Sequence, residues 1–280
     1  MIEPALSDDT FLADLAAAPR SPDQLHLWWL GQSGFLVQHG TTRVLLDPYL
    51  SDSLTEKYAK TDKPHVRMSR RVVDPARLTG INLITSSHAH TDHLDAQTLA
   101  PLMRANPDAH FATSRANLRV AGQRLGRDVD LPIEAGESIR VGGMTLHALP
   151  AAHETAEQDA NGSCLYLGFV LSIGGFQIYH SGDTVLFDGM VDLLRPHAVD
   201  LALLPINGRS PERRVAGNLC GREAAWLAKE IGAKLVVPCH YDMFEFNTAT
   251  PEEFIAECAR LGQAYRVLKL GERRTLRNDV

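Results

Sequence analysis

His88-Ala89-His90-Thr91-Asp92-His93 decides how this sequence is interpreted, because four side chains that can bind a metal ion fall within six residues. The preceding segment 81–85 (Ile-Asn-Leu-Ile-Thr) is apolar and β-branched and predicts a buried strand. Asp95 follows and can cap a helix that begins near Ala96. The cluster is therefore predicted to lie on a strand-to-helix loop, where a rigid scaffold presents ligands to a cleft.

The conformation of this loop determines how many ions it can serve. In an extended chain, His88, His90 and Asp92 would share one face and His93 would take the other. In a curled chain, His88 and His90 would bind one ion while Asp92 and His93 turn toward a second. A polar, solvated loop is the alternative, but the pattern should arise by chance in well under about 1% of chains of this length.

Length and composition predict one large α/β domain, residues 1–280, with two intimately packed halves as the alternative. A chain of 280 residues can bury a large core. The formal net charge of -6 argues against nucleic acid or an anionic membrane as the main partner. We therefore expect a small-molecule substrate, and a homo-oligomer stays open.

Cysteine usage and the N-terminal sequence predict the compartment. Cys164, Cys220, Cys239 and Cys258 show no C-x-x-C spacing and are expected to be reduced structural thiols. Residues 1–20 lack a basic start followed by an apolar core, so no signal peptide is expected. No apolar run approaches the roughly 20 residues needed to span a bilayer. These features predict a soluble, cytoplasmic protein.

Apolar strands along the chain end at or near polar residues. These residues are Asp47, His88, His153, Asp183, Asn207 and His240. In layered α/β proteins, sites form where strand ends converge. An α/β/β/α sandwich, with helices outside two packed sheets, would gather these loops along one edge.

Histidines and carboxylates together are the donor set of many hydrolytic metal sites. The predicted ligands of one ion are His88, His90 and His153, and those of a second ion are Asp92, His93 and His240. Asp183 is placed between the two ions, because a carboxylate can bridge them and the preceding Gly182 allows close backbone approach. A mononuclear centre that uses a subset of these side chains is the alternative.

The remaining polar residues receive smaller roles. Asp47 is predicted to hold a ligand histidine by its other ring nitrogen. The other histidines are expected to be structural: His26, His39, His65, His110, His147, His180 and His197. His180 is the least certain of them, because it lies near Asp183 in the sequence.

Two further segments carry specific predictions. Apolar residues do not recur at a helix or strand spacing in residues 51–71, which predicts a long, partly basic loop without regular structure. A loop of this length is a candidate lid. The last helix is predicted to begin with a capping box between Thr250 and Glu253, with Pro251 at its first position.

The ligand pattern His88-x-His90-x-Asp92-His93, followed by His153, Asp183 and His240, resembles the metallo-β-lactamase superfamily over nearly the whole chain. Finer features are similar to the branch that contains L-ascorbate-6-phosphate lactonase. These features lie in segments 29–35, 47–52, 205–209, 217–218, 221–224 and 238–244.

The resemblance implies a four-layer αββα sandwich and a metal-dependent hydrolase. Water activated by one or two manganese or zinc ions would attack the lactone carbonyl of a sugar-acid lactone phosphate, such as L-ascorbate 6-phosphate. Asp92 would orient or deprotonate that water, and Asp183 would complete the catalytic pair.

A phosphate site is also suggested by the residues themselves. Arg209, Arg213 and Arg214 lie on a loop just after a strand end, and guanidinium groups suit bidentate phosphate contacts. A solvated basic loop is the alternative reading. Substrate hydrogen bonds near the metals are expected from Asn207, Asn218 and Tyr241.

Competing functions are separable in part from the sequence. A phosphodiesterase or nuclease can use the same paired metals, although the acidic balance and the lack of a basic, aromatic-studded groove disfavour a long nucleic-acid substrate. A secreted β-lactamase is disfavoured because no signal peptide is expected. A di-iron oxygen-reducing centre is disfavoured because that branch typically has Glu where this chain has His90. A non-catalytic regulatory or RNA-binding protein that keeps the metals is the alternative from another class.

Overall fold

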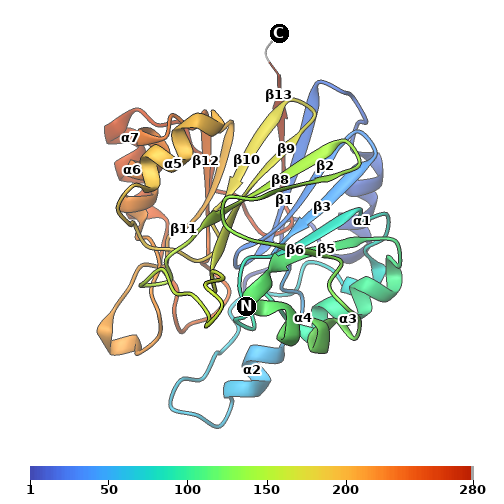
Figure 1. Ribbon diagram of the computed structural model, residues 1–280, viewed down its shortest axis with the longest axis horizontal. Helices are drawn as coiled ribbons and strands as arrows, with labels where there is room; N and C mark the ends of the chain where they lie inside the picture. The colour runs from blue at the N-terminus through green and yellow to red at the C-terminus, as the bar shows by residue number, and fades with distance from the viewer. Residues whose placement is uncertain (279–280) are drawn as a thin grey trace.

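The computed structural model of the protein describes residues 1–278. Two β-sheets pack against each other in the middle of the molecule, and helices cover the outer face of each (Figure 1). The helices α5, α6 and α7 lie outside one sheet, and α1, α3 and α4 lie outside the other. The predicted αββα sandwich is therefore confirmed.

The first sheet contains the N-terminal strands together with the last strand, β13, and the second sheet contains the strands between them. The first sheet has the strand order β13-β1-β2-β3-β4-β5-β6, and the second has the order β12-β11-β10-β9-β8-β7. The first-sheet strands are β1 (Gln24–Gly31), β2 (Gly34–His39), β3 (Thr42–Leu46), β4 (Leu83–Ser86), β5 (His110–Ser114), β6 (Leu131–Ile133) and β13 (Arg273–Arg277). The second-sheet strands are β7 (Ser138–Val141), β8 (Met144–Pro150), β9 (Leu167–Ile173), β10 (Phe176–His180), β11 (Leu201–Pro205) and β12 (Leu235–Cys239).

The helices mostly connect parallel strands. They are α1 (Asp8–Ala17), α2 (Ser53–Tyr58), α3 (Ala96–Ala105), α4 (Leu118–Leu125), α5 (Met190–Leu194), α6 (Gly221–Glu230) and α7 (Glu252–Leu261). Single turns of 3-10 helix lie at Pro75–Arg77, Arg115–Asn117, Arg195–His197 and Pro211–Arg213. Within residues 1–278, no helix combines the length and the apolar character that a membrane crossing requires.

Burial on both faces explains why the central strands are apolar along their whole length. In β1, every residue from Leu25 to Gly31 is buried. Trp28 packs edge-on against Phe11 of α1, and its indole Nε1 donates to Asp14 Oδ2 at 2.8 Å. One face of the strand thus meets the helix layer, and the alternate side chains enter the core between the sheets.

The direction of the strands gathers the polar residues predicted at strand ends. β3 pairs in parallel with β4, and β10, β11 and β12 are also parallel. Their carboxyl ends therefore meet at one edge of the sandwich. The helix after the loop 88–93 begins as predicted, since Asp95 accepts hydrogen bonds from the backbone N–H of Gln97 and Thr98.

Two local predictions were wrong. The segment 51–71 is not without regular structure, because it contains the short helix α2, which Leu54 anchors by being buried. Isolated helices this short are unstable, so tertiary packing rather than periodicity stabilises it. The predicted capping box is also not formed: α7 begins at Glu252 after Pro251, and the Glu253 carboxylate pairs instead with Arg222 at 3.2 Å.

Candidate metal centre

The loop after β4 is curled rather than extended. The backbone N–H groups of His93 and Leu94 both donate to the carbonyl of His90, at 3.1 and 2.9 Å. Arg124 of α4 holds the turn from outside, since its Nη1 donates to the carbonyls of Ala89 and Leu94 at 2.7 and 2.8 Å. This conformation is the one that lets the histidines of the loop serve two groups of ligands.

The first group consists of His88, His90 and His153, whose candidate ligand atoms lie within 4.8 Å of one another. His153 Nδ1 contacts the carbonyl of Gly217 at 2.9 Å, which leaves its Nε2 facing the group. The buried His88 Nε2 has no hydrogen-bond partner among the described residues. A buried nitrogen without a partner is costly in an empty site and is satisfied by a bound cation.

The second group consists of Asp92, His93 and His240, again within 4.8 Å. Asp92 Oδ2 lies 3.8 Å from His93 Nε2 and 3.5 Å from His240 Nε2. His93 Nε2 is buried and, within the described chain, makes no hydrogen bond.

Asp183 lies between the two groups. Its Oδ1 is 3.3 Å from His93 Nε2, and its Oδ2 is 3.4 Å from His240 Nε2 and 3.8 Å from His153 Nε2. The side chain is nearly buried, and Ser33 Oγ donates to Oδ1 at 3.3 Å. One carboxylate thus reaches both groups, which is the geometry that a bridging ligand requires.

Asp47 orients His93 from behind. His93 Nδ1 donates to Asp47 Oδ2 at 2.7 Å, and Ser87 donates to the same carboxylate through its backbone N–H at 2.9 Å and through its hydroxyl. Both Asp47 and His93 are fully buried. This contact fixes a proton on Nδ1, so Nε2, which faces Asp92 and Asp183, is the nitrogen that could ligate an ion.

The electrostatics of the site favour a cation. Burial lowers the pKa of His88 well below its ordinary value, and the neighbouring His93 and His90 lower it further, so this imidazole is neutral. Burial also lowers the pKa of His93, but the carboxylates of Asp183 and Asp92 outweigh it and raise that pKa well above the ordinary value. The same carboxylates would stabilise a divalent ion, and imidazole with carboxylate suits zinc and manganese.

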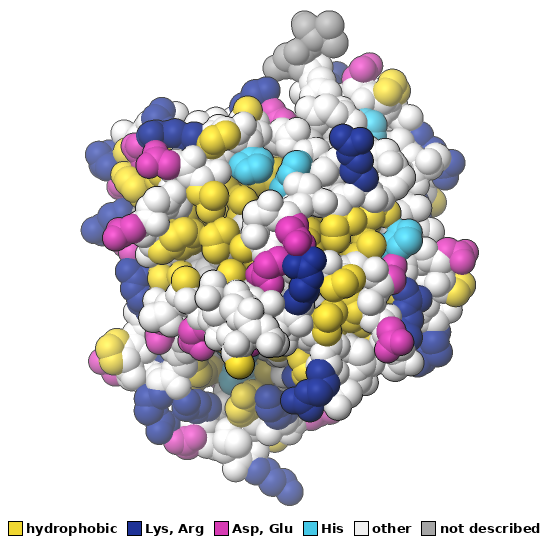
Figure 2. Space-filling view, viewed as in Figure 1, with side chains coloured by type: hydrophobic (Ala, Val, Ile, Leu, Met, Phe, Trp, Pro, Cys, Tyr) yellow, Lys and Arg dark blue, Asp and Glu magenta, His cyan; other side chains and the backbone are white. Residues whose placement is uncertain are grey.

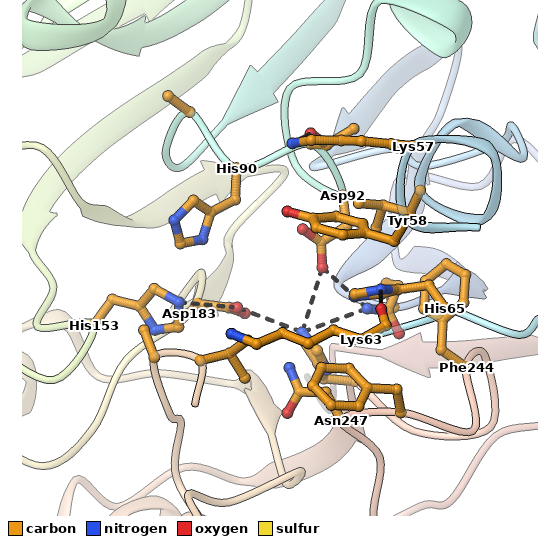
Figure 3. Close-up of a pocket in the computed structure, with 18 of the residues that line it drawn as sticks. Lys57, Tyr58, Lys63, His65, His90, Asp92, His153, Asp183, Phe244 and Asn247 are labelled. Carbon is orange, nitrogen blue, oxygen red and sulfur yellow. Dashed lines mark hydrogen bonds and ion pairs between the residues drawn. The ribbon is translucent and has the colours of Figure 1, made fainter. Parts of the chain in front are cut away.

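Members of both groups line a cavity of about 490 Å³, a size typical of small-molecule sites. The lining includes His90, Asp92, His153, Asp183 and His240, whereas His88 and His93 lie buried behind it. One wall comes from α2 and the residues after it, and another comes from the loop after His240 (Figure 3). The residues of these two walls are Leu54, Lys57, Tyr58, Lys63, His65, Phe244, Phe246 and Asn247. Val215 and Ala216, from the segment before α6, also line the cavity. His65 stacks on Tyr58 with ring centroids 4.5 Å apart and also contacts Phe244 and Phe246, so this aromatic cluster joins the two walls.

Comparison with known proteins identifies the superfamily. The sequence profile of the β-lactamase superfamily domain matches residues 42–241, which include all seven predicted metal ligands. The chain belongs to the metallo-β-lactamase superfamily.

Within the superfamily, the chain falls among the UPF0173 metal-dependent hydrolases. The relative from Rubrobacter xylanophilus is 32% identical over 253 residues, which cover 87% of this chain and 93% of that protein. The relative from Opitutus terrae is 32% identical over 259 residues, covering 89% and 98%.

Solved structures of the superfamily share the fold. Igni18, a metallo hydrolase from Ignicoccus hospitalis, superposes with a TM-score of 0.66 at 25% identity and covers 90% of this chain and 98% of its own. An isothiocyanate hydrolase from Delia radicum gut bacteria gives a TM-score of 0.71 at 18% identity, with coverage of 90% and 99%.

The residues that were predicted to contact the substrate do not line the cavity. Within residues 1–278, the lining of the metal cavity does not include Asn207, Arg209, Arg213, Asn218 or Tyr241. Arg209 forms a bidentate pair with the Glu223 carboxylate, with N–O distances of 2.6 and 2.8 Å.

The other four members of that set are engaged in structural contacts. Arg213 donates to the carbonyls of Asn207 and Thr248, at 2.6 and 3.0 Å, and Asn218 Nδ2 donates to Asn207 Oδ1 at 3.0 Å. Tyr241 is buried, and its hydroxyl donates to the Leu268 carbonyl at 2.7 Å.

Sequence reasoning missed several residues that line the cavity. Gln32 stands in the quoted segment 29–35, and Lys57 and Lys63 stand in the basic segment 51–71, but nothing in either pattern places them at the metals. His65, expected to be structural, also lines the cavity. His180 takes no part in either ligand group and contacts the Ser33 carbonyl at 2.8 Å through Nε2.

Replacing Gly182 with alanine is expected to lower the free energy of unfolding by about 3 kcal/mol. Gly182 has φ +60°, and an added Cβ would lie 2.6 Å from Ser87 Cβ and 2.8 Å from the Leu167 carbonyl oxygen. Gly142→Ala is the matched control, since Gly142 has φ +56° with nothing within 4 Å and should cost only about 1 kcal/mol. Denaturant unfolding of both variants measures the difference, and equal losses would show that the close approach is unimportant.

Proposed function

We propose that this protein hydrolyses a lactone or related carboxylic ester in a sugar-acid lactone phosphate, such as L-ascorbate 6-phosphate, with one or two bound manganese or zinc ions. The observation that carries the proposal is the pair of ligand groups on either side of Asp183, next to a substrate-sized cavity that members of both groups line. The proposed ligands are His88, His90, Asp92, His93, His153, Asp183 and His240.

The chain's own residues divide the remaining work. A bound divalent ion would lower the pKa of a coordinated water toward neutrality and polarise the scissile carbonyl. Asp92 lines the cavity and is placed to orient that water or accept its proton. The Asp183 carboxylate lies between His93 and His240 and orients both imidazoles. Asp47 binds Nδ1 of His93, so that Nε2 can ligate an ion.

The phosphate end of the substrate is proposed to meet Lys57 and Lys63. In Figure 3 both side chains extend from the α2 side across the cavity toward the side where His90 and His153 lie. In the described part of the chain, neither lysine forms an ion pair with a carboxylate; Lys57 Nζ lies 3.5 Å from Thr91 Oγ1 and Lys63 Nζ donates to the carbonyl of Arg214. Figure 2 shows further Lys and Arg side chains around the end of the molecule that carries α2. This charge would attract an anionic substrate.

A metal-dependent phosphodiesterase is the second candidate. The two ligand groups on either side of Asp183 favour it, because paired metal ions can stabilise both the attacking and the leaving oxygen of a phosphodiester. The same lysines would contact a second phosphate oxygen.

Metal removal and substrate comparison test the two candidates together. Purified protein is stripped with chelator, reloaded with Mn²⁺ or Zn²⁺, and assayed on sugar-acid lactone phosphates and on bis-aryl phosphodiesters. We expect activity to vanish on stripping, to return on reloading, and to favour the lactones. Turnover of diesters alone would refute the lactonase, and a chain that takes up no metal would refute the metal centre.

Alanine substitution of Lys57 and Lys63 is expected to raise KM for a lactone phosphate by about 10-fold each, because a hydrogen bond to a charged partner is lost. KM for the same lactone without its phosphate should stay unchanged. Lys60→Ala is the control, since Lys60 is exposed in the same segment and does not line the cavity. An equal rise in KM for both substrates would contradict the phosphate role.

A further inference from the structure

The backbone of Gln32 is held in place beside the proposed metal ligands. Gln32 occupies the turn between β1 and β2 with φ +46° and is almost fully buried. Its backbone carbonyl accepts hydrogen bonds from Trp29 Nε1 at 2.9 Å and from the backbone N–H of His240 at 3.0 Å. These two contacts leave the side chain directed into the cavity that Asp92 and His240 line.

The Gln32 amide contacts the same atoms that would bind the second ion. Its Nε2 donates to Asp92 Oδ2 at 3.0 Å and lies 3.4 Å from His240 Nε2. The carboxylate partner fixes the orientation of the amide, because only the NH₂ group can donate to it. An imidazole nitrogen that ligates an ion uses its one lone pair to do so, and His240 Nε2 therefore cannot keep the Gln32 amide as a hydrogen-bond donor while it ligates an ion.

The first ligand group has no such competitor. His88 Nε2 has no partner among residues 1–278, and the His153 contact with Gly217 uses Nδ1 and leaves Nε2 open. Among the described residues, the Gln32 side chain donates to Asp92 and contacts His240, and it makes no hydrogen bond to His88, His90 or His153. Before any ion binds, Gln32 therefore contacts ligand atoms of the second group and none of the first.

We propose that Gln32 sets the metal occupancy of this site. One ion binds tightly at His88, His90 and His153, and a second binds at Asp92, His93 and His240 only after the Gln32 amide turns away. The second ion is then the weaker and exchangeable one. This inference rests on the metal centre of the proposed function and concerns only the relative affinity of its two halves.

Metal titration of the full-length protein tests the inference. Chelator-stripped protein is titrated with Mn²⁺ alone, and bound metal is counted by equilibrium dialysis with elemental analysis. Electron paramagnetic resonance distinguishes an isolated Mn²⁺ ion from a coupled pair. We expect the wild type to bind one ion at least about 10-fold more tightly than the second, and Gln32→Ala to tighten the second site by about 10-fold, so that the coupled signal appears at lower Mn²⁺ concentration.

Two further variants make the outcome decisive. Gln32→Met keeps the volume without donors, so it should also tighten the second site if the hydrogen bonds rather than the space are what compete. Gln123→Ala, on the exposed surface of α4, should behave as the wild type. Circular dichroism establishes that each variant is folded.

The experiment distinguishes a failure of the Gln32 proposal from a failure of the proposed metal centre. Two ions of equal affinity in the wild type, or an unchanged second site in both Gln32 variants, would overturn the role of Gln32 and leave the proposed hydrolase intact. A wild type that binds no Mn²⁺ would overturn both.

Discussion

Asp183→Ala is expected to lower kcat/KM by at least about 10³-fold while the chain stays folded. Asp183 lies 3.3 Å from His93, 3.4 Å from His240 and 3.8 Å from His153, so its carboxylate reaches both ligand groups. Its loss removes the proposed bridging ligand and leaves His93 and His240 without the carboxylate that lies between them. Steady-state kinetics of the Mn²⁺-loaded variant measure the effect.

The controls separate chemistry from folding. Asp188→Ala removes an exposed carboxylate five residues away on the same connection and should retain full activity. Thermal unfolding of the metal-free Asp183→Ala protein should remain cooperative. Full activity of Asp183→Ala would show that Asp183 is not the bridging ligand. If Asp183→Ala does not fold, Asp183→Asn replaces it, because asparagine keeps the side-chain volume and should show the same loss of activity.

Asp47→Asn is expected to weaken metal binding by about 10- to 100-fold although Asp47 contacts no ion in the proposed centre. The wild-type carboxylate accepts from His93 Nδ1 at 2.7 Å and from the Ser87 backbone N–H at 2.9 Å. If the asparagine oxygen keeps the Ser87 contact, its NH₂ group faces His93 Nδ1. The imidazole must then carry its proton on Nε2, the nitrogen directed at Asp183 and Asp92. Ligation by His93 is lost with almost no change in shape.

Competition with a chromophoric chelator measures this affinity for Zn²⁺ or Mn²⁺, with Asp108→Asn on the exposed surface as control. Asp47 is fully buried, so we also expect the free energy of unfolding of the metal-free protein to fall by about 2 kcal/mol. Unchanged metal affinity in a folded Asp47→Asn protein would show that Asp47 serves the fold alone.

Much of the fold was predictable because it is encoded locally. The strand before His88 and the Asp95-capped helix after it depend on side-chain periodicity and on a carboxylate next to free backbone N–H groups. The edge strands β6 and β13 were missed, since Leu131–Ile133 is very short and Arg273–Arg277 is mostly charged. β13 is paired with β1 through its backbone, and no pattern in its side chains signals that pairing.

The sequence by itself determined which side chains could form the metal centre. The six-residue stretch from His88 to His93 and the polar residues at later strand ends specify the donors, and parallel strands bring their carboxyl ends to one edge. The predicted link between Asp47 and a histidine also follows from this convergence.

Only the tertiary structure decided what surrounds those donors. Gln32 reaches Asp92 across 60 residues of sequence, and Lys57 and Lys63 line the cavity because α2 folds against the loop that carries Phe244. Arg209 faces Glu223 instead of the cavity. The physical reason is that strand and helix formation depends on neighbours along the chain, whereas the partner of a side chain depends on how two sheets and their loops pack, which local sequence does not encode.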